Sequence, residues 1–160
     1  MFPYTALPLH IFEPRYREMV MYCLEHDSPL GVVLIREGSE VGDPNAEPHE
    51  IGTLARIGRL RRQPDGRIHL LALGEERFQI VRLIRGDAPY LKAQVRLWRD
   101  FEPFSWEEEQ RYADEVAGQF REFLKLALDA SGLRVEEIEL PRSPTALSFA
   151  IAGTLQLEMP

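Results

Sequence analysis

The chain has 160 residues, a formal net charge of −7, 44% hydrophobic and 28% charged residues, which is typical of one folded domain or two small lobes. Its longest apolar run, residues 30–35, is far shorter than the roughly 20 residues that cross a bilayer, and the N-terminus lacks the features of a signal peptide. One cysteine, Cys23, excludes an internal disulfide and a thiolate metal site. We therefore expect a cytoplasmic globular protein that does not contact a membrane.

The first hundred residues predict mainly strands. Residues 7–12 form a short apolar stretch, and Pro14 then suits the first turn of a helix. Residues 15–26 have helical spacing, with an apolar stripe of Tyr16, Met19, Val20, Cys23 and Leu24. Residues 30–36 indicate a buried strand, and the acidic, Gly- and Pro-rich residues 37–50 indicate a surface loop.

A hairpin pattern follows. Residues 51–62 and 67–73 flank the turn Gln63-Pro64-Asp65-Gly66, in which proline presets one backbone angle and glycine accepts a positive φ. The alternation of polar and apolar residues in the first strand is broken at Gly58, which predicts a β-bulge there.

Two more strands are expected before residue 100. Gly74-Glu75-Glu76 predicts a break, residues 78–84 the next strand, residues 86–89 a turn and residues 90–98 a further strand. Consecutive strands with short connections predict a strongly bent antiparallel sheet or an open barrel.

The pattern becomes helical near residue 101. Ser105 and Glu108 form a capping box before a long helix that ends at Ser131-Gly132. Apolar residues recur along it at spacings of three and four: Tyr112, Val116, Phe120, Phe123, Leu124 and Ala127. Ser143-Pro144 opens another helix, with Leu147, Phe149, Ile151 and Leu155. The fold class is thus α+β, with a bent antiparallel β lobe (residues 1–100) that contains one helix and a C-terminal helical lobe (residues 101–160).

Charge is unevenly distributed. Residues 51–99 contain 11 Lys/Arg and 4 Asp/Glu, whereas residues 1–50 contain 3 and 9, and residues 100–160 contain 5 and 13. A basic middle segment suits a nucleic acid or an acidic partner. The interpretation that we favour is that arginines cover the solvent face of a sheet, because the charges alternate with apolar residues.

Motifs for catalysis are absent. The chain has no glycine-rich phosphate loop ending in Lys-Ser or Lys-Thr, and neither Lys92 nor Lys125 has a serine near it in sequence. The four histidines lack metal-ligand spacing; His49 lies between Glu47 and Glu50 in the predicted loop, where solvation is favoured over metal binding. Cys23 is expected to be a small buried hydrophobe. We predict no catalytic residue, cofactor or metal.

The remaining sequence feature that indicates a function is the number of aromatic residues near the N-terminus. The first 25 residues contain five aromatic side chains: Phe2, Tyr4, Phe12, Tyr16 and Tyr22. For any single one of them a place in the core is favoured. An edge strand or groove that exposed those outside the core would suit binding of an extended, unfolded peptide.

Residues 7–17, LPLHIFEPRYR, resemble the start of the Lon N-terminal domain family, and especially its short stand-alone bacterial members. Further matching segments follow in family order and extend the strong resemblance over residues 2–98: 31–38, 51–57, 60–67, 74–80 and 89–91. The resemblance implies a PUA-like β lobe and a helical lobe. In Lon proteases this domain collects unfolded or tagged substrates for an ATPase and a Ser–Lys peptidase and has no catalytic residue.

The chain departs from the family pattern at both ends. The family's further first strand and Phe-Pro-Gly turn are reduced to Phe2-Pro3-Tyr4, and residues 157–160 stand where relatives continue into another helix. We expect both ends to be truncated. A missing first strand predicts an open sheet edge through which the chain self-associates.

The leading hypothesis is therefore a non-catalytic module that recognises exposed hydrophobic segments of unfolded or tagged polypeptides, as in protein quality control. We predict contact residues Phe12, Tyr16 and Met19, and structural roles for Arg15 and Arg77. A protease or a chaperone is the expected protein partner. The first alternative is a PUA-like module that binds nucleic acid through the basic residues 51–99, which the acidic chain and the lack of an aromatic–basic RNA motif disfavour; a small-molecule hydrolase ranks last.

Overall fold

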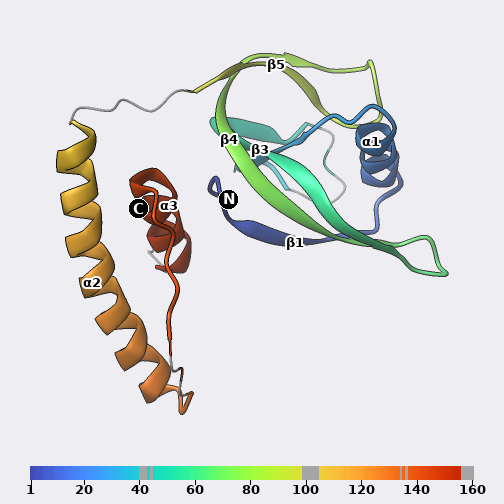
Figure 1. Ribbon diagram of the computed structural model, residues 1–160. Coiled ribbons are helices and arrows are strands. Elements are labelled where there is room, and N and C mark those ends of the chain that lie inside the picture. Colours follow the sequence, from blue (N-terminus) through green and yellow to red (C-terminus); the bar gives the residue numbers. More distant parts are fainter. Residues whose placement is uncertain (40–42, 44, 99–104, 134, 136, 156–160) are drawn as a thin grey trace. The chain divides into compact units, whose positions relative to one another are not determined.

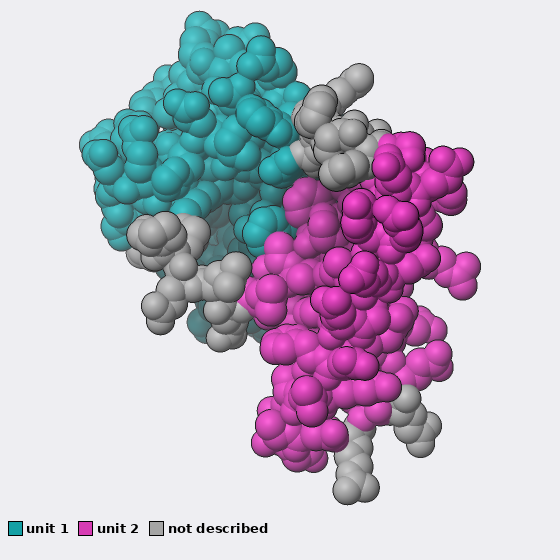
Figure 2. Space-filling view, turned by 90° about the vertical axis from the view of Figure 1, so that its left-hand side faces the viewer, with its two compact units in different colours: residues 1–99 teal, residues 100–160 magenta. Residues whose placement is uncertain are grey.

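The computed structural model of the chain describes residues 1–39, 43, 45–98, 105–133, 135 and 137–155. It has two units, residues 1–99 and residues 100–160, coloured separately in Figure 2. The first contains β1 (Ala6–Ile11), α1 (Pro14–Glu25), β2 (Leu30–Glu37), β3 (Glu47–Arg62), β4 (Ile68–Ile84) and β5 (Lys92–Leu97). The second contains α2 (Trp106–Ala130) and α3 (Pro144–Thr154). The predicted α+β class is confirmed.

All strand pairs of the sheet are antiparallel, in the order β1-β4-β3-β2, with β5 also on β4. β4 is 17 residues long, so its first half pairs with β1 and its second half with β5, while β3 follows most of its length. The long, curved pair of β3 and β4 dominates the unit in Figure 1, and the turn that joins them projects at its right-hand side.

The predicted break at Gly74-Glu75-Glu76 is wrong, because β4 runs through it. Thr53 pairs with Arg77 and Ala55 with Gly74, so β4 holds one residue more than β3 between these pairs. The extra residue forms a local irregularity in the strand pairing. Because β4 is paired on both sides of this irregularity, the strand stays continuous. Residues 47–50 likewise belong to β3 and not to the predicted loop, since Pro48 pairs with Ile35. Residues 40–42 and 44 of that loop lie outside the described residues.

The predicted hairpin turn and the predicted bulge are both confirmed. Gly66 has a φ of +83°, and its N–H donates to the Gln63 carbonyl over 3.0 Å. Ile57 pairs with Ala72 and Arg59 with Leu71, so Gly58 is the extra residue of β3.

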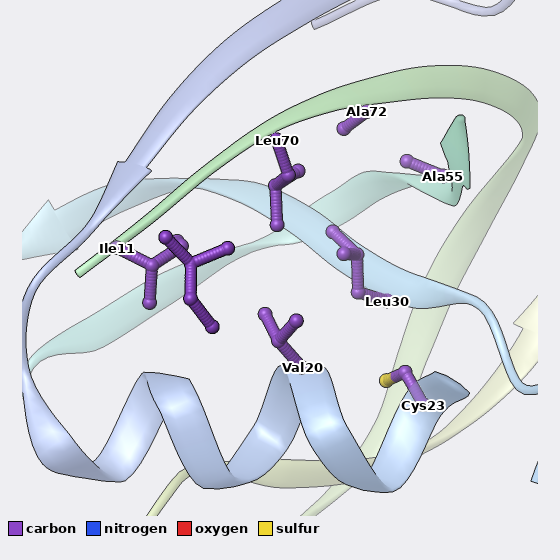
Figure 3. Packing of buried hydrophobic residues seen from close by; sticks show 8 residues of the cluster. Ile11, Val20, Cys23, Leu30, Ala55, Leu70 and Ala72 are labelled. Carbon is purple, nitrogen blue, oxygen red and sulfur yellow. The ribbon is translucent and has the colours of Figure 1, made fainter. Parts of the chain in front are cut away.

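The core of the first unit lies between α1 and the inner side of the sheet (Figure 3). α1 turns Val20 and Cys23 toward Ile11, Leu30 and Leu70 of the strands, and Val20 is fully buried. The whole cluster is Ile11, Val20, Cys23, Leu30, Ala55, Ile68, Leu70 and Ala72. Leu24, which belongs to the predicted apolar stripe, is exposed because the stripe that contacts the sheet is narrower and centred on Val20 and Cys23.

Local signals determine the helices of the second unit. Ser105 and Glu108 form the predicted capping box, α2 ends before Gly132 with its φ of +75°, and the Ser143 side chain accepts a hydrogen bond from Ala146 N–H at the start of α3. The packed residues are mostly small: Ala113, Ala117 and Leu147. Tyr112, Val116 and Phe123 of the predicted apolar stripe are exposed, because α3 packs on the alanines of the neighbouring helix face.

Candidate binding surface

The side of the sheet opposite α1 has three rows of side chains, each with one residue from β3, one from β4 and one from β1. The rows are Arg56–Leu73–Ala6, Arg59–Leu71–Pro8 and Arg61–His69–His10. Residues directly opposite each other on antiparallel strands point to the same side, with Cβ atoms about 5 Å apart. Their neighbours Ile57, Leu60, Leu70 and Ala72 point to the core side. We call these nine residues the outer face.

The β3 side of the outer face is a column of arginines. The Arg56 guanidinium lies 2.6 Å from the Glu75 carboxylate. Arg59 and Arg61 are exposed and have no ion pair among the residues that the structure describes. This side of the sheet is therefore positively charged.

Beside the arginines lies an apolar strip of Leu71, Leu73, Pro8 and Ala6. The Leu73 side chain, 41% exposed, lies across Gly58, where a Cβ would come within 3.0 Å of its Cδ1. Glycine at the bulge thus lets a leucine lie flat between two strands. Near the end of this strip the Tyr4 N–H donates to the Gly74 carbonyl over 2.9 Å, and the Tyr4 side chain is 63% exposed.

Aromatic rings close the other end of the outer face. The imidazoles of His10 and His69 stack with centroids 4.5 Å apart and planes 5° from parallel. The Phe12 ring lies 5.9 Å from that of His10. Phe12 therefore belongs to the corner of the outer face, next to the last row.

Part of β3 also has an open backbone edge. β2 pairs with β3 only as far as Ala55, opposite Leu30. Among the described strands, residues 56–62 pair with β4 alone, so one of their two edges is unpaired. The outer edge of β1 has no described partner strand either.

The structure separates the three predicted contact residues. Tyr16 and Met19 are half-buried and pack against the core cluster from α1. Phe12 is 47% exposed and lies with His10 on the other side of β1. The three side chains therefore do not form one patch; whether they contact a polypeptide stays a prediction.

Arg15 has the structural contacts expected of it. Its Nε donates to the Glu13 carboxylate over 2.9 Å, and its guanidinium lies 4.5 Å from the centre of the Tyr16 ring. Both contacts lie within the first turn of α1 and its N-cap residue Glu13. For Arg77, the backbone carbonyl accepts a hydrogen bond from Trp98 N–H over 2.8 Å, which fixes the end of β5.

The groups considered for chemistry have structural roles. Burial raises the pKa of the Cys23 thiol, which disfavours a reactive thiolate. Glu47, near His49, forms an ion pair with Arg85 at 3.1 Å. In the described part of the chain no group of three His, Cys, Asp or Glu residues is placed to hold a metal. Among the described helices none combines the length and apolar character that crossing a membrane requires.

The sequence analysis predicted arginines on the solvent face of a sheet but not the rows of the outer face, although two signals for these rows are present. Arg59 and Arg61 alternate with Leu60, and the turn at residues 63–66 sets which residue of β4 each one meets. The apolar strip has no such signal, because Leu71 and Leu73 look like core residues of an alternating strand.

Comparison with known families and proteins gives a consistent result. The family described as the ATP-dependent protease La (LON) substrate-binding domain matches residues 1–160. Lon protease 2 of Myxococcus xanthus is 27% identical over 156 residues, which are 98% of this chain and 19% of that protein. The Lon protease of Phenylobacterium zucineum is 30% identical over 161 residues, 99% of this chain and 20% of that protein. The chain thus spans about a fifth of these relatives.

Two solved structures share the fold. The N-terminal domain of a Mycobacterium avium complex Lon protease has a TM-score of 0.61 and 17% identity, covering 98% of this chain and 78% of that one. A Lon N-terminal domain protein from Xanthomonas campestris has a TM-score of 0.53 and 24% identity, covering 72% and 66%. Both matches support the antiparallel sheet followed by helices.

Proposed function

Because the chain belongs to the family of Lon substrate-binding domains, we propose that it is a non-catalytic module that binds exposed hydrophobic segments of unfolded or tagged polypeptides. Substrate recognition is the role of the family, and the matched part of the relatives is the substrate-binding domain. The observation that supports binding of hydrophobic segments is the exposed apolar strip of the outer face, with Phe12 at its corner.

The strip suits weak and tolerant binding. Leu73 and Phe12 offer exposed apolar area on a flat surface, and no deep polar pocket is needed to hold a side chain of one shape. Each contact contributes little, so affinity is low and many sequences are accepted. Tyr16 and Met19, which lie on α1 and not on the outer face, would make separate contacts through the part of their side chains that the core leaves exposed.

A polypeptide that is bound by a non-catalytic module must then be passed to another protein that acts on it. The relatives are proteases of which this chain spans about a fifth, so a protease or a chaperone is the partner that we propose, acting in the cytoplasm. Self-association through the outer edge of β1 belongs to the same proposal, since that edge has no described partner strand.

The test compares one model protein in its native and its permanently denatured form. We expect the chain to bind the denatured form and not the native form, measured by fluorescence anisotropy. Equal binding of both forms, or of neither, would contradict the proposal. Tight binding of a single-stranded oligonucleotide, steeply weakened by salt, would support the nucleic-acid alternative instead.

Variants locate the surface. Leu73→Ser and Phe12→Ser should each weaken binding of the denatured protein about threefold, because each removes one exposed apolar contact. Val81→Ser is the matched control, since Val81 is also an exposed apolar residue of β4 but lies beyond the outer face. An equal loss in the control would show that the outer face is not the binding surface.

A further inference from the structure

We propose that the open edge of β3 binds an extended acidic segment of polypeptide, whose carboxylates at alternate positions pair with Arg59 and Arg61. This inference rests on the proposed function, because it names the class of polypeptide that the same face captures. It concerns a part of the outer face that the apolar strip does not include.

The backbone of β3 supplies the first part of the site. Residues 56–62 pair with β4 on one edge, and on the other edge they have no partner among the described strands. An unpaired edge offers N–H and C=O groups to a further strand, and an extended peptide can add to it. The bulge at Gly58 interrupts this edge, so the regular stretch begins at Arg59.

The spacing of the arginines supplies the second part. Arg59 and Arg61 are two residues apart and point to the same side, as their partners Leu71 and His69 do. In an added strand the residues opposite them are also two apart, with Cβ atoms about 5 Å from those of the arginines. Two carboxylates at positions i and i+2 thus meet two guanidinium groups.

The residue between those carboxylates points to the other side of the sheet. It lies beside Leu60, which packs against the core cluster. An apolar side chain there extends that cluster, whereas a charged one loses water without gaining a partner. The expected motif is therefore acidic–apolar–acidic in an extended segment.

Charge complementarity favours an acidic segment as the occupant of this edge. The acids closest to the arginines in the hairpin are already paired, Glu75 with Arg56 and Asp65 with Arg67 at 2.6 Å each. Residues 56–67 hold five arginines and one aspartate, and the Arg17 guanidinium approaches the Gly66 carbonyl at 3.4 Å at the same end. The site is thus a local positive surface on a chain of net charge −7.

A polypeptide fits this surface better than a nucleic acid. Proteins that bind single-stranded nucleic acid combine a long basic groove with aromatic side chains on which bases stack. On the outer face, among the described residues, two arginines have no ion pair, and the residues across from them are leucine, proline and stacked imidazoles. An extended polypeptide can pair with both the N–H and the C=O groups of a free backbone edge, whereas a phosphodiester backbone can only accept from the N–H groups.

The experiment uses the full chain and three labelled twelve-residue peptides at low salt, with fluorescence anisotropy as the readout. The first alternates Glu and Val, the second alternates Lys and Val, and the third has the composition of the first with its Glu residues in adjacent pairs. We expect the first to bind at least about tenfold more tightly than either of the others, since only it places carboxylates at i and i+2. A form of the first peptide that is N-methylated at the N–H groups that would pair with β3 should lose its binding.

Substitutions test the arginines. The double variant Arg59→Glu, Arg61→Glu should bind the Glu–Val peptide about tenfold more weakly and gain affinity for the Lys–Val peptide. Arg82→Glu is the control, because Arg82 is exposed on β4 away from this edge and should change binding less than twofold. Circular dichroism spectra and melting temperatures of all variants verify that they fold.

Three results of the binding experiment would overturn the inference, and one result on self-association would do so as well. The three binding results are unchanged binding in the double variant, equal binding of the three peptides, or tighter binding of a single-stranded oligonucleotide that competes with the peptide. Binding of denatured protein that survives the double variant would leave the proposed function in place and remove only this inference. Self-association that the double variant abolishes would show that a second copy is the occupant, and this also overturns it.

Discussion

The two units of this chain bury different kinds of side chain. The first unit packs eight residues from α1 and four strands into one cluster, with Val20 fully enclosed. The second has a smaller cluster of two alanines and Leu147, with Phe120 of α2 also buried, while Trp106 and Leu126 are each 71% exposed. Tertiary burial therefore defines the first unit, whereas helix caps define much of the second. This difference predicts where substitutions will be costly and where they will not.

The largest effect is expected in the core of the first unit. Leu70→Ala should lower the free energy of unfolding by about 3 kcal/mol, because Leu70 is buried between α1 and the sheet and a cavity would remain. Urea denaturation measures the change. Leu97→Ala, a half-exposed leucine of β5, is the control and should cost less than about 1 kcal/mol.

The second prediction compares the units directly. Leu147→Ala should destabilise the second unit by about 2 kcal/mol, since Leu147 is the largest of the buried side chains in that cluster, against which Leu140 and Ile151 also pack. Hydrogen exchange should become faster in α2 and α3 and stay unchanged in the sheet. Equally faster exchange in β3 and β4 would mean that the units unfold together.

The third prediction concerns the capping box at the start of α2. Ser105→Ala should destabilise α2 by about 1 kcal/mol, because the Ser105 side chain accepts from Glu108 N–H and the Glu108 carboxylate accepts in return. The helical circular dichroism signal during urea denaturation reports it. Ser148→Ala, which removes a hydroxyl within α3, should have a smaller effect, and a reversed order would show that the cap is not what holds α2.

The smallest effect is expected at the hairpin turn and depends on pH. Hydrogen bonds from Arg67 hold the pKa of Asp65 below its usual range. A lowered pKa in the folded state contributes stability at neutral pH that is lost as the pH falls through that pKa. Asp65→Asn should therefore be slightly less stable than the unchanged chain at pH 7, and the difference should disappear once the pH lies below the lowered pKa of Asp65. A difference that persists in acid would contradict this cause.

The sequence predicted the helices more accurately than the strands. Ser105, Ser131-Gly132 and Ser143-Pro144 each act through neighbours a few residues away, so their effect is visible in the sequence. The course of β4 past Gly74 depends on β3 and β5, whose residues are distant in sequence, and the predicted break was wrong for that reason. Exposure of Tyr112 and Phe123 depends on which face of α2 meets α3.

The candidate surface was only partly predictable. The basic character of residues 51–99 and their alternation with apolar residues indicated arginines on the solvent face of a sheet, which Arg59 and Arg61 confirm. Their alignment with Leu71 and His69 depends on the register, which a single extra residue changes. The choice of Phe12, Tyr16 and Met19 followed aromatic and apolar density alone, and density does not distinguish the two sides of β1.

The bulge at Gly58 has a consequence for how this hairpin tolerates changes in length. Gly58 and Arg59 both lie on the solvent side, so deleting Gly58 would join Ile57, facing the core, directly to Arg59, facing solvent. Every later residue of β3 would keep its side and its partner. Inserting a residue elsewhere in β3 would instead turn each following side chain over. Gly58 is thus the position at which this strand can lose a residue while the side chains that follow stay on their own sides of the sheet.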